Sequence, residues 1–321
     1  MGLTDIFLLL GGIALFLYGM KIMAEGLNLL AGEQMKKILE KLTNNIFVAM
    51  LVGTIVTATI QSSTAVTVMV VGFVNAGMMT LIQAVGVIMG ANIGTTITSQ
   101  LVAFDIAKVA PLIAFVGFLI ITLVKKEKIK QVGEVVIGLG ILFIGMNSMS
   151  DAMAPLKDVQ EIKDVMTRFS NPLLGVLIGT VVTCIIQSSS ASVGILQAIA
   201  SQGLISLTSS IYIVFGQNIG TCLTAIVATI GTNKNAIRAA VSHVLINVIG
   251  TILFIFIVLV LPVEEWIISM SPNNVVRQIA NVHTIFNIGS AILLLPLTKL
   301  IVRLSVYLVP DGNKSSKQST L

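Results

Sequence analysis

The sequence predicts an all-α polytopic membrane protein with two repeats of opposite orientation, about seven transmembrane spans and two re-entrant helical hairpins. Three observations lead to this prediction. Hydrophobic residues make up 55% of the chain and charged residues only 10%, whereas a soluble domain carries about 25% charged residues. Uncommon polar motifs recur at one fixed spacing. Basic residues gather in a few segments, as orientation signals do in membrane proteins.

An internal duplication relates the two halves of the chain by an offset of 126 residues without a gap. Gln61-Ser-Ser matches Gln187-Ser-Ser, and Gly90-Ala-Asn-Ile-Gly-Thr matches Gly216-Gln-Asn-Ile-Gly-Thr. Apolar matches arise readily by chance in such a chain, but shared Gln, Asn, Gly and Thr at one offset do not. We therefore divide the chain into repeat 1 (1–126), repeat 2 (127–262), an extra span (263–310) and a polar, disordered tail (311–321).

Apolar runs near the roughly 20 residues of a membrane-crossing helix define the expected spans. They lie at about 5–25, 80–100, 108–124, 133–150, 208–228, 238–260 and 281–305. The segments 45–75 and 171–203 fit less easily, because Gln-Ser-Ser divides each into two runs too short to cross alone. Each segment is either one helix with a polar middle or a re-entrant hairpin with the motif at its tip.

Loop charge distinguishes these two topologies. With hairpins, 14 of the 19 Lys and Arg residues share one side, in segments 21–45, 125–130, 234–238 and 299–317. Basic loops favour the cytoplasmic side, so we expect hairpins, an outer N-terminus and a cytoplasmic C-terminus in the plasma (inner) membrane. Three crossings per repeat make repeat 2 inverted, and the two tips then meet near the midplane. Secondary transporters have this architecture.

Each hairpin tip presents the N-terminus of a helix, whose free N–H groups and positive dipole end favour an anion. Hydroxyl groups add further donors. The expected anion ligands are Ser62, Ser63, Thr64, Ser188, Ser189 and Ser190. Amide, hydroxyl and carbonyl oxygens suit a hard cation such as Na⁺. The expected cation ligands are Gln61, Gln187, Asn92, Asn218, Thr95 and Thr221, although the division between the two sets stays open.

Charged side chains are expected only in loops and at span ends, with no Lys or Arg in mid-span. An oxyanion at the midplane would then meet no fixed positive charge, and its desolvation would be expensive. Cations bound beside it would remove most of this cost, so the sequence favours joint binding of an anion and Na⁺. His243 and His283 each stand four residues before an asparagine, on one helix face, and could act as interhelical hydrogen-bonding groups or as a proton relay.

The paired Gln-Ser-Ser motifs, each followed by Asn-Ile-Gly-Thr, resemble those of the type II sodium–phosphate cotransporter family over residues 5–300. The resemblance implies a transporter and not an enzyme: a symporter of inorganic phosphate driven by Na⁺, working by alternating access at a midplane site formed by both tips. The implied partners are phosphate, Na⁺ and the lipid bilayer, with no organic cofactor and no nucleic acid, and a homodimer is left open. One departure is that His243 and Asn247 have no counterpart in repeat 1, where Gly117 matches the histidine.

Two alternatives keep the architecture. The cargo is another oxyanion (arsenate, sulfate or a carboxylate), or the protein is an anion channel whose flux is independent of sodium. An intramembrane hydrolase is weakly supported, because the motif serines have no recognisable base beside them. Stoichiometry and the direction of transport also stay open.

Overall fold

The computed structural model describes residues 2–40, 45–104 and 106–311, and within them the chain forms helices and no strand. Six helical segments are long and apolar enough to cross a membrane. They are α1 (Leu3–Glu40), α4 with α5 (Leu81–Gly94, Thr96–Val102), α7 with η2 (Glu127–Met153, Ala154–Asp158), α11 with α12 (Leu207–Gly220, Cys222–Val227), α13 (Lys234–Val260), and α15, η3 and α16 (Val275–Leu294, Leu295–Leu297, Thr298–Leu308). A seventh is counted if α8 (Gln160–Arg168) and α9 (Pro172–Ile186), bent by 99°, form one span. The protein is therefore an all-helical integral membrane protein, as predicted.

Several helices differ in length from the expected spans, and two of them affect the topology. The first, α1, has 38 residues and continues well past the expected 5–25. The second, α6 (Ala110–Leu123), follows the short turn η1 (Ala107–Val109) where a span over 108–124 was expected. Its 14 residues rise about 21 Å, less than the roughly 30 Å of a hydrocarbon core. It is thus a short apolar helix. The connection from its C-terminal end to α7 contains Lys125 and Lys126.

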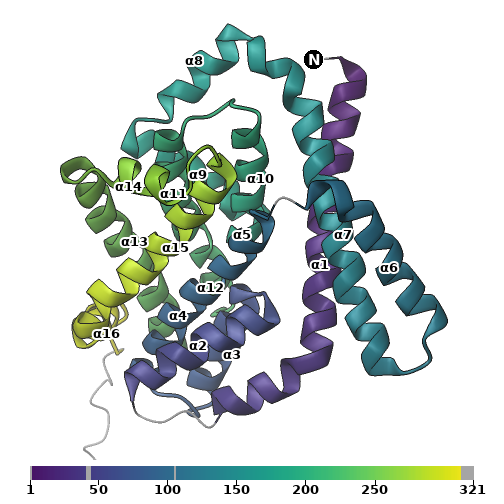
Figure 1. The fold of residues 1–321 in the computed structure, drawn as a ribbon. Helices are drawn as coiled ribbons and strands as arrows, with labels where there is room; N and C mark the ends of the chain where they lie inside the picture. Colours follow the sequence, from purple (N-terminus) through teal and green to yellow (C-terminus); the bar gives the residue numbers. More distant parts are fainter. Residues whose placement is uncertain (1, 41–44, 105, 312–321) are drawn as a thin grey trace, which may run out of the picture.

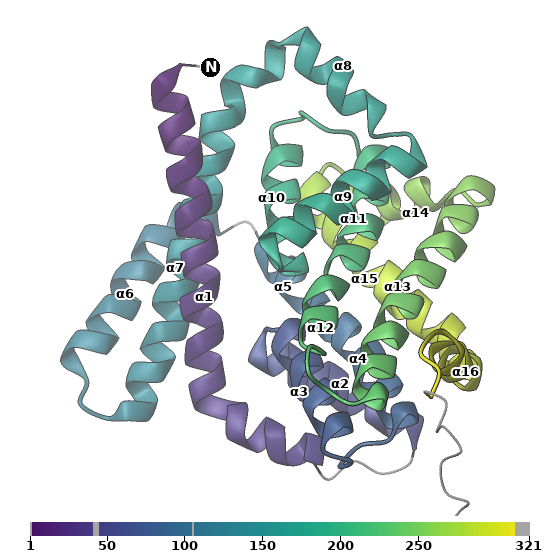
Figure 2. The same ribbon diagram turned by 180° about the vertical axis from the view of Figure 1, so that it is seen from behind.

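Helices α1, α6 and α7 lie together as an arm beside the remaining helices (Figures 1 and 2). The contact of α1 with α7 depends on glycines from both helices. A Cβ at Gly19 would lie 2.7 Å from the carbonyl oxygen of Gly138, and a Cβ at Gly145 would lie 2.7 Å from that of Gly12. Only glycine permits this approach of two backbones, a common mode of helix association in membranes.

The local structure repeats at the offset of 126 residues. Helix α2 (Ile46–Ile60) corresponds to α9, α3 (Ser63–Asn75) corresponds to α10 (Ser189–Ser201), and α4 corresponds to α11, each with the same first and last positions. Gly77 and Gly203 both adopt positive φ, 72° and 70°, in the turns that follow α3 and α10. The duplication is thus present in backbone conformation, while the inverted orientation of repeat 2 stays a prediction.

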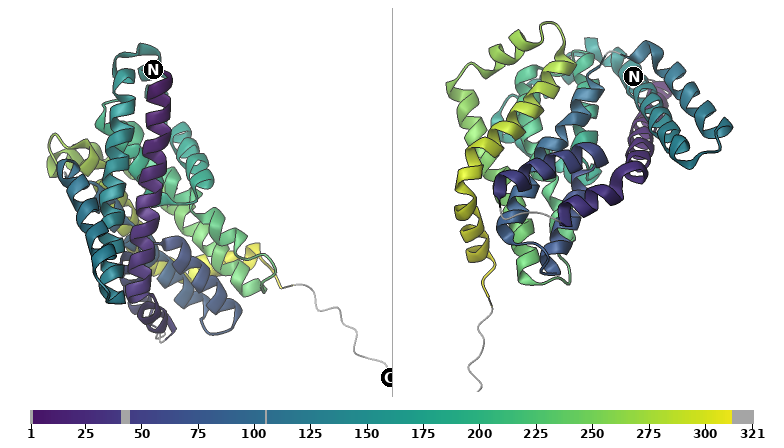
Figure 3. Two further views of the ribbon diagram at one scale, coloured as in Figure 1. Left: turned by 90° about the vertical axis from the view of Figure 1, so that its right-hand side faces the viewer. Right: turned by 60° about the horizontal axis from the view of Figure 1, so that its bottom comes forward.

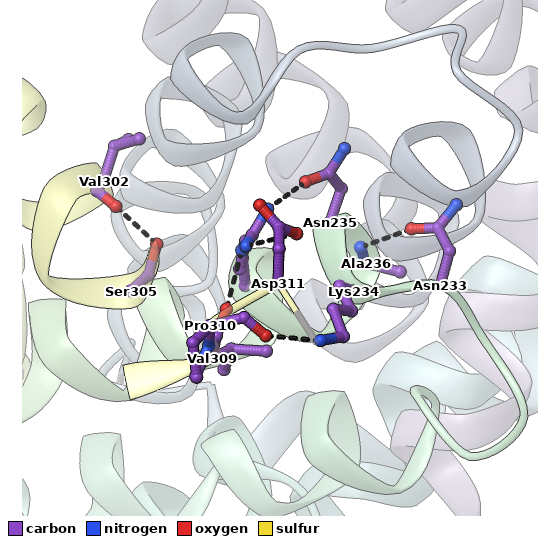
Figure 4. Close-up of polar contacts among 10 residues, drawn as sticks. Asn233, Lys234, Asn235, Ala236, Val302, Ser305, Val309, Pro310 and Asp311 are labelled. Carbon is purple, nitrogen blue, oxygen red and sulfur yellow. Dashed lines mark hydrogen bonds and ion pairs between the residues drawn. The ribbon is translucent and has the colours of Figure 1, made fainter. Parts of the chain in front are cut away.

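Three of the described segments expected on the cytoplasmic side lie at one end of the molecule. The C-terminal end of α1, the α6–α7 connection and α16 lie at the end opposite to the N-terminus and α8 (Figures 1 and 3). At the same end, Arg238 donates through Nε to the carbonyl of Val309 at 3.0 Å and pairs through its second terminal nitrogen with Asp311 at 2.8 Å. Lys234 donates to the carbonyl of Pro310 (Figure 4).

Asn233, just before α13, connects the same cluster to repeat 1. Its backbone N–H donates to Oδ1 of Asn75, the last residue of α3, at 2.9 Å. Asp311, expected in a disordered tail, is therefore fixed by Arg238, and the rest of that expected tail, 312–321, lies outside the described residues. Which side of the membrane this end faces stays a prediction.

Candidate functional site

The first Gln-Ser-Ser motif breaks the helix between α2 and α3. Gln61 ends α2 in the left-handed region (φ 59°, ψ 26°), and its N–H still donates to the carbonyl of Thr57 at 2.7 Å. Ser62 is extended and caps α3, because its Oγ accepts the N–H of Ala65 at 3.2 Å. A left-handed residue followed by an N-cap stops one helix and starts another within two residues. The motif is therefore a helix–break–helix device.

The second motif adopts the same backbone geometry. Gln187 has φ 59° and ψ 22°, its N–H donates to the carbonyl of Thr183 at 2.7 Å, and the Oγ of Ser188 caps α10 through the N–H of Ala191 at 3.3 Å. Both helices that follow the motifs thus begin with their N–H groups at the break, where an anion is favoured.

A cavity of about 240 Å³ brings the two motifs together. Gln61 and Ser62 line it from the first motif, Ser188 and Ser190 from the second, and Thr98 from α5. Helix α1 closes another wall with Leu17, Met20, Lys21, Met23 and Ala24. Since one water occupies about 30 Å³ in the liquid, a small oxyanion fits here with several waters.

Two hydrogen bonds connect the broken span formed by α4 and α5 to the motifs. The hydroxyls of Thr95 and Ser190 lie 3.0 Å apart and join the α4–α5 break of repeat 1 to the motif of repeat 2. Thr98 donates through Oγ1 to Oε1 of Gln61 at 2.6 Å, and Nε2 of Gln61 donates to the carbonyl of Ala58 at 2.5 Å. The side chain of Gln61 is thereby fixed within repeat 1.

The remaining expected ligands are distributed around the cavity and not within it. Ser63 and Ser189 are buried at the first positions of α3 and α10, and Thr64 is partly buried beside Ser63. Gln187 is exposed and does not line the cavity, unlike its counterpart Gln61.

The Asn-Ile-Gly-Thr residues also differ between the repeats. Asn92 donates to Oδ1 of Asn247 on α13 at 3.2 Å. Asn218 and Thr221 bond to carbonyls of their own helix, those of Val214 and Gln217, at 2.9 and 3.0 Å. The roles of all these residues as ligands stay predictions.

The electrostatics of the site differ from the expectation in one respect. Lys21 lies at the middle of α1 and lines the cavity, so the expectation that an anion would meet no fixed positive charge is wrong. The charge pattern placed Lys21 at the cytoplasmic end of the expected span 5–25, whereas α1 continues to Glu40, so that Lys21 lies in the interior of the helix. Among the described residues, no group of three His, Cys, Asp or Glu side chains is placed to hold a metal ion.

Comparison with known proteins decides the family. The profile of the Na⁺/Pi-cotransporter family matches residues 15–151 and, a second time, residues 152–293. The chain belongs to the Na⁺/Pi-cotransporter family. YqeW of Bacillus subtilis (strain 168) is 34% identical over 93% of this chain and 96% of its own length.

Two other relatives cover less of the chain. YjbB of Escherichia coli (strain K12), named for inorganic phosphate export, is 28% identical over 66% of this chain, which spans only 39% of that relative. Sodium-dependent phosphate transport protein 2B of Homo sapiens is 33% identical over 32% of this chain and 15% of its own length. No solved structure matches the chain.

The two histidines of this family member have different surroundings. Nδ1 of His283 lies 2.6 Å from Oγ of Ser99, which joins α15 to α5 as an interhelical hydrogen bond. The buried ring of His243 has no hydrogen-bond partner within the described part of the chain, and its backbone carbonyl accepts from Asn247 and Cys222. The interhelical expectation is therefore confirmed for His283 and wrong for the ring of His243.

Thr98 and Lys21 are the two polar residues of the cavity lining that the sequence did not lead us to expect. Thr98 lies three residues after Thr95, within the same polar run, so its position was available in the sequence. Lys21 lies two residues after Gly19, which is about 200° around a helix. The glycines that pack on α7 therefore place Lys21 on the opposite face of α1, toward the motifs.

Proposed function

We propose that the protein is a secondary active transporter that couples the movement of inorganic phosphate to Na⁺, by alternating access, at the cavity between the two Gln-Ser-Ser motifs. The observation that carries this proposal is the convergence of both motifs on one cavity. Residues 126 positions apart, Ser62 and Ser188, line the same space. Two helix N-termini and several hydroxyls around one cavity supply donors for an oxyanion.

Sodium coupling is supported by the oxygen-rich surroundings. The described residues lining the cavity contain amide and hydroxyl oxygens, from Gln61, Ser62, Thr98, Ser188 and Ser190, and no carboxylate. Neutral oxygens suit Na⁺ and leave the site free of negative charge that would repel phosphate. Family membership and the names of two relatives, one sodium-dependent and one for export, support phosphate as the cargo. The gradients would then set the direction.

The test is uptake of radiolabelled phosphate into proteoliposomes, with an inward Na⁺ gradient compared with equal K⁺. We expect accumulation only with Na⁺, undiminished by excess unlabelled sulfate. Flux indifferent to Na⁺ would replace the symporter by an anion channel. Competition by sulfate, a carboxylate or arsenate would assign the site to a broader range of anions.

Orientation, plasma-membrane location and the inverted repeats belong to the same proposal. Cysteines introduced at Ser150 and at Lys128 should react with a membrane-impermeant thiol reagent from opposite sides of the membrane. Cross-linking in native membranes tests the homodimer.

A further inference from the structure

One face of α1 forms a wall of the cavity. Leu17, Met20, Lys21 and Ala24 follow at intervals of three and four residues, which places them on one side of a helix. Three of these side chains are apolar. Among the described residues that line the cavity, Lys21 is the one charged side chain. A cation therefore faces the two motifs from across the cavity.

The one ion pair that involves Lys21 among the described residues is with Glu25, one turn later on α1. Its Nζ lies 3.8 Å from a carboxylate oxygen of Glu25. The side chains are 66% and 61% exposed, so the pair is not sequestered in packing. Exposed pairs at i and i+4 are weak, and the ammonium group can exchange one carboxylate for another anion readily.

We expect the pair to face water and not lipid. Exposed side chains earlier on α1, such as Leu10, Leu15 and Tyr18, are the kind that face hydrocarbon. Charged side chains at membrane depth face a bundle interior or a water-filled cavity, because hydrocarbon disfavours them strongly. The first charged side chains that follow along the helix are those of Lys21, which lines the cavity, and of Glu25, one turn later.

We propose that Lys21 is a specificity-determining residue that attracts the oxyanion into the cavity, and that Glu25 competes with the anion for its ammonium group. The inference rests on the proposed function and deepens it. When phosphate is outside, Glu25 neutralises Lys21. When phosphate enters, the ammonium group turns from Glu25 to the anion, which then has a cation on one side and hydroxyl and N–H donors on the other. An ammonium group serves phosphate as a compact point charge with three donors.

The two members of the pair give opposite signs in one experiment. In proteoliposomes, Lys21→Gln should raise the KM for phosphate about fivefold, and Glu25→Gln should lower it, because the competitor and its negative charge are gone. Lys21→Arg should keep a KM within about twofold of the wild type, since the positive charge is retained. Lys37→Gln is the matched control: it removes an exposed lysine of the same helix that does not line the cavity.

Ionic strength supplies an independent readout. Raising choline chloride from about 50 to 300 mM should raise the wild-type KM and leave that of Lys21→Gln nearly constant, because salt screens an accessible charge. A purely structural role for Lys21 would not produce this difference. Size-exclusion profiles of all variants show that they remain folded.

The inference is overturned if Lys21→Gln and Glu25→Gln keep the wild-type KM, or if both change it in the same direction. A wild-type protein that moves no phosphate would reject the proposed function itself, and the inference with it. Sodium-dependent uptake in the wild type with unchanged KM in both variants would reject the inference alone.

Discussion

Thr98→Val is the substitution that tests most sharply whether the polar contacts at the cavity have a function. The hydroxyl of Thr98 donates to Oε1 of Gln61 at 2.6 Å, and both residues line the cavity. Valine has nearly the shape of threonine, so the variant removes the hydrogen bond and leaves the packing of the buried side chain in place. The side chain of Gln61 then keeps only its bond to the carbonyl of Ala58.

The magnitude follows from the environment of the lost bond. A neutral hydrogen bond contributes about 1 kcal/mol net, and a buried partner left unsatisfied costs about 1–3 kcal/mol. Gln61 is only partly buried and its oxygen can bind water in the cavity, which favours the lower value. A loss of about 1 kcal/mol corresponds to roughly a fivefold higher KM, since 1.4 kcal/mol is a factor of ten.

The assay is the initial rate of Na⁺-driven phosphate uptake in proteoliposomes, measured against phosphate and against Na⁺. Thr224→Val is the control from the equivalent position of repeat 2, where the hydroxyl bonds only to the carbonyl of Thr221 in the same helix at 2.9 Å. We expect Thr98→Val to raise the half-saturation concentration for phosphate or for Na⁺ about fivefold. Thr224→Val should keep both values within about twofold of the wild type. Equal effects of the two variants would refute the assignment of the cavity as the transport site.

Two further predictions concern stability, measured by thermal unfolding of the purified protein. Gly90→Ala should destabilise the fold by at least ~2 kcal/mol, because the new Cβ would collide with the carbonyl of Met50. Gly72→Ala is the control: a Cβ there would meet open space, so the variant should be neutral or stabilised by up to ~1 kcal/mol. A tolerated Gly90→Ala would contradict the close packing of α2 on α4. Arg238→Ala should lower Tm more than Asp311→Ala, because buried Arg238 makes three hydrogen bonds and exposed Asp311 accepts only one of them. A larger loss of Tm in Asp311→Ala would contradict the anchoring role of Arg238.

The sequence predicted the parts of the structure that depend on local chemistry. A Gln-Ser-Ser motif between two apolar runs indicated a break, and the fixed offset placed the same break in both halves. The left-handed conformation of Gln61 and Gln187 and the serine caps show how the break is made. Hydropathy located the long apolar helices for the same reason, since the length of an apolar run depends on the segment alone.

The parts that the sequence did not predict depend on how helices are rotated against one another. Hydropathy gives no rotation, so neither Lys21, at the end of an expected span, nor Thr98 was assigned to the cavity. The repeats also carry different neighbours, and the side chain of Gln61 is fixed by Thr98 while that of Gln187 is exposed. The duplication therefore predicts the same backbone conformation in both repeats, whereas the side-chain contacts differ because each repeat packs against different neighbours.

The central claim is that both motifs form one anion site, and the stoichiometry of phosphate binding tests it most directly. Equilibrium binding of radiolabelled phosphate to the purified protein in Na⁺ should saturate at one phosphate per chain, and both Ser62→Ala and Ser188→Ala should weaken that single binding event. Two phosphates per chain, with each variant removing one of them, would contradict the claim and show that each motif binds an anion of its own.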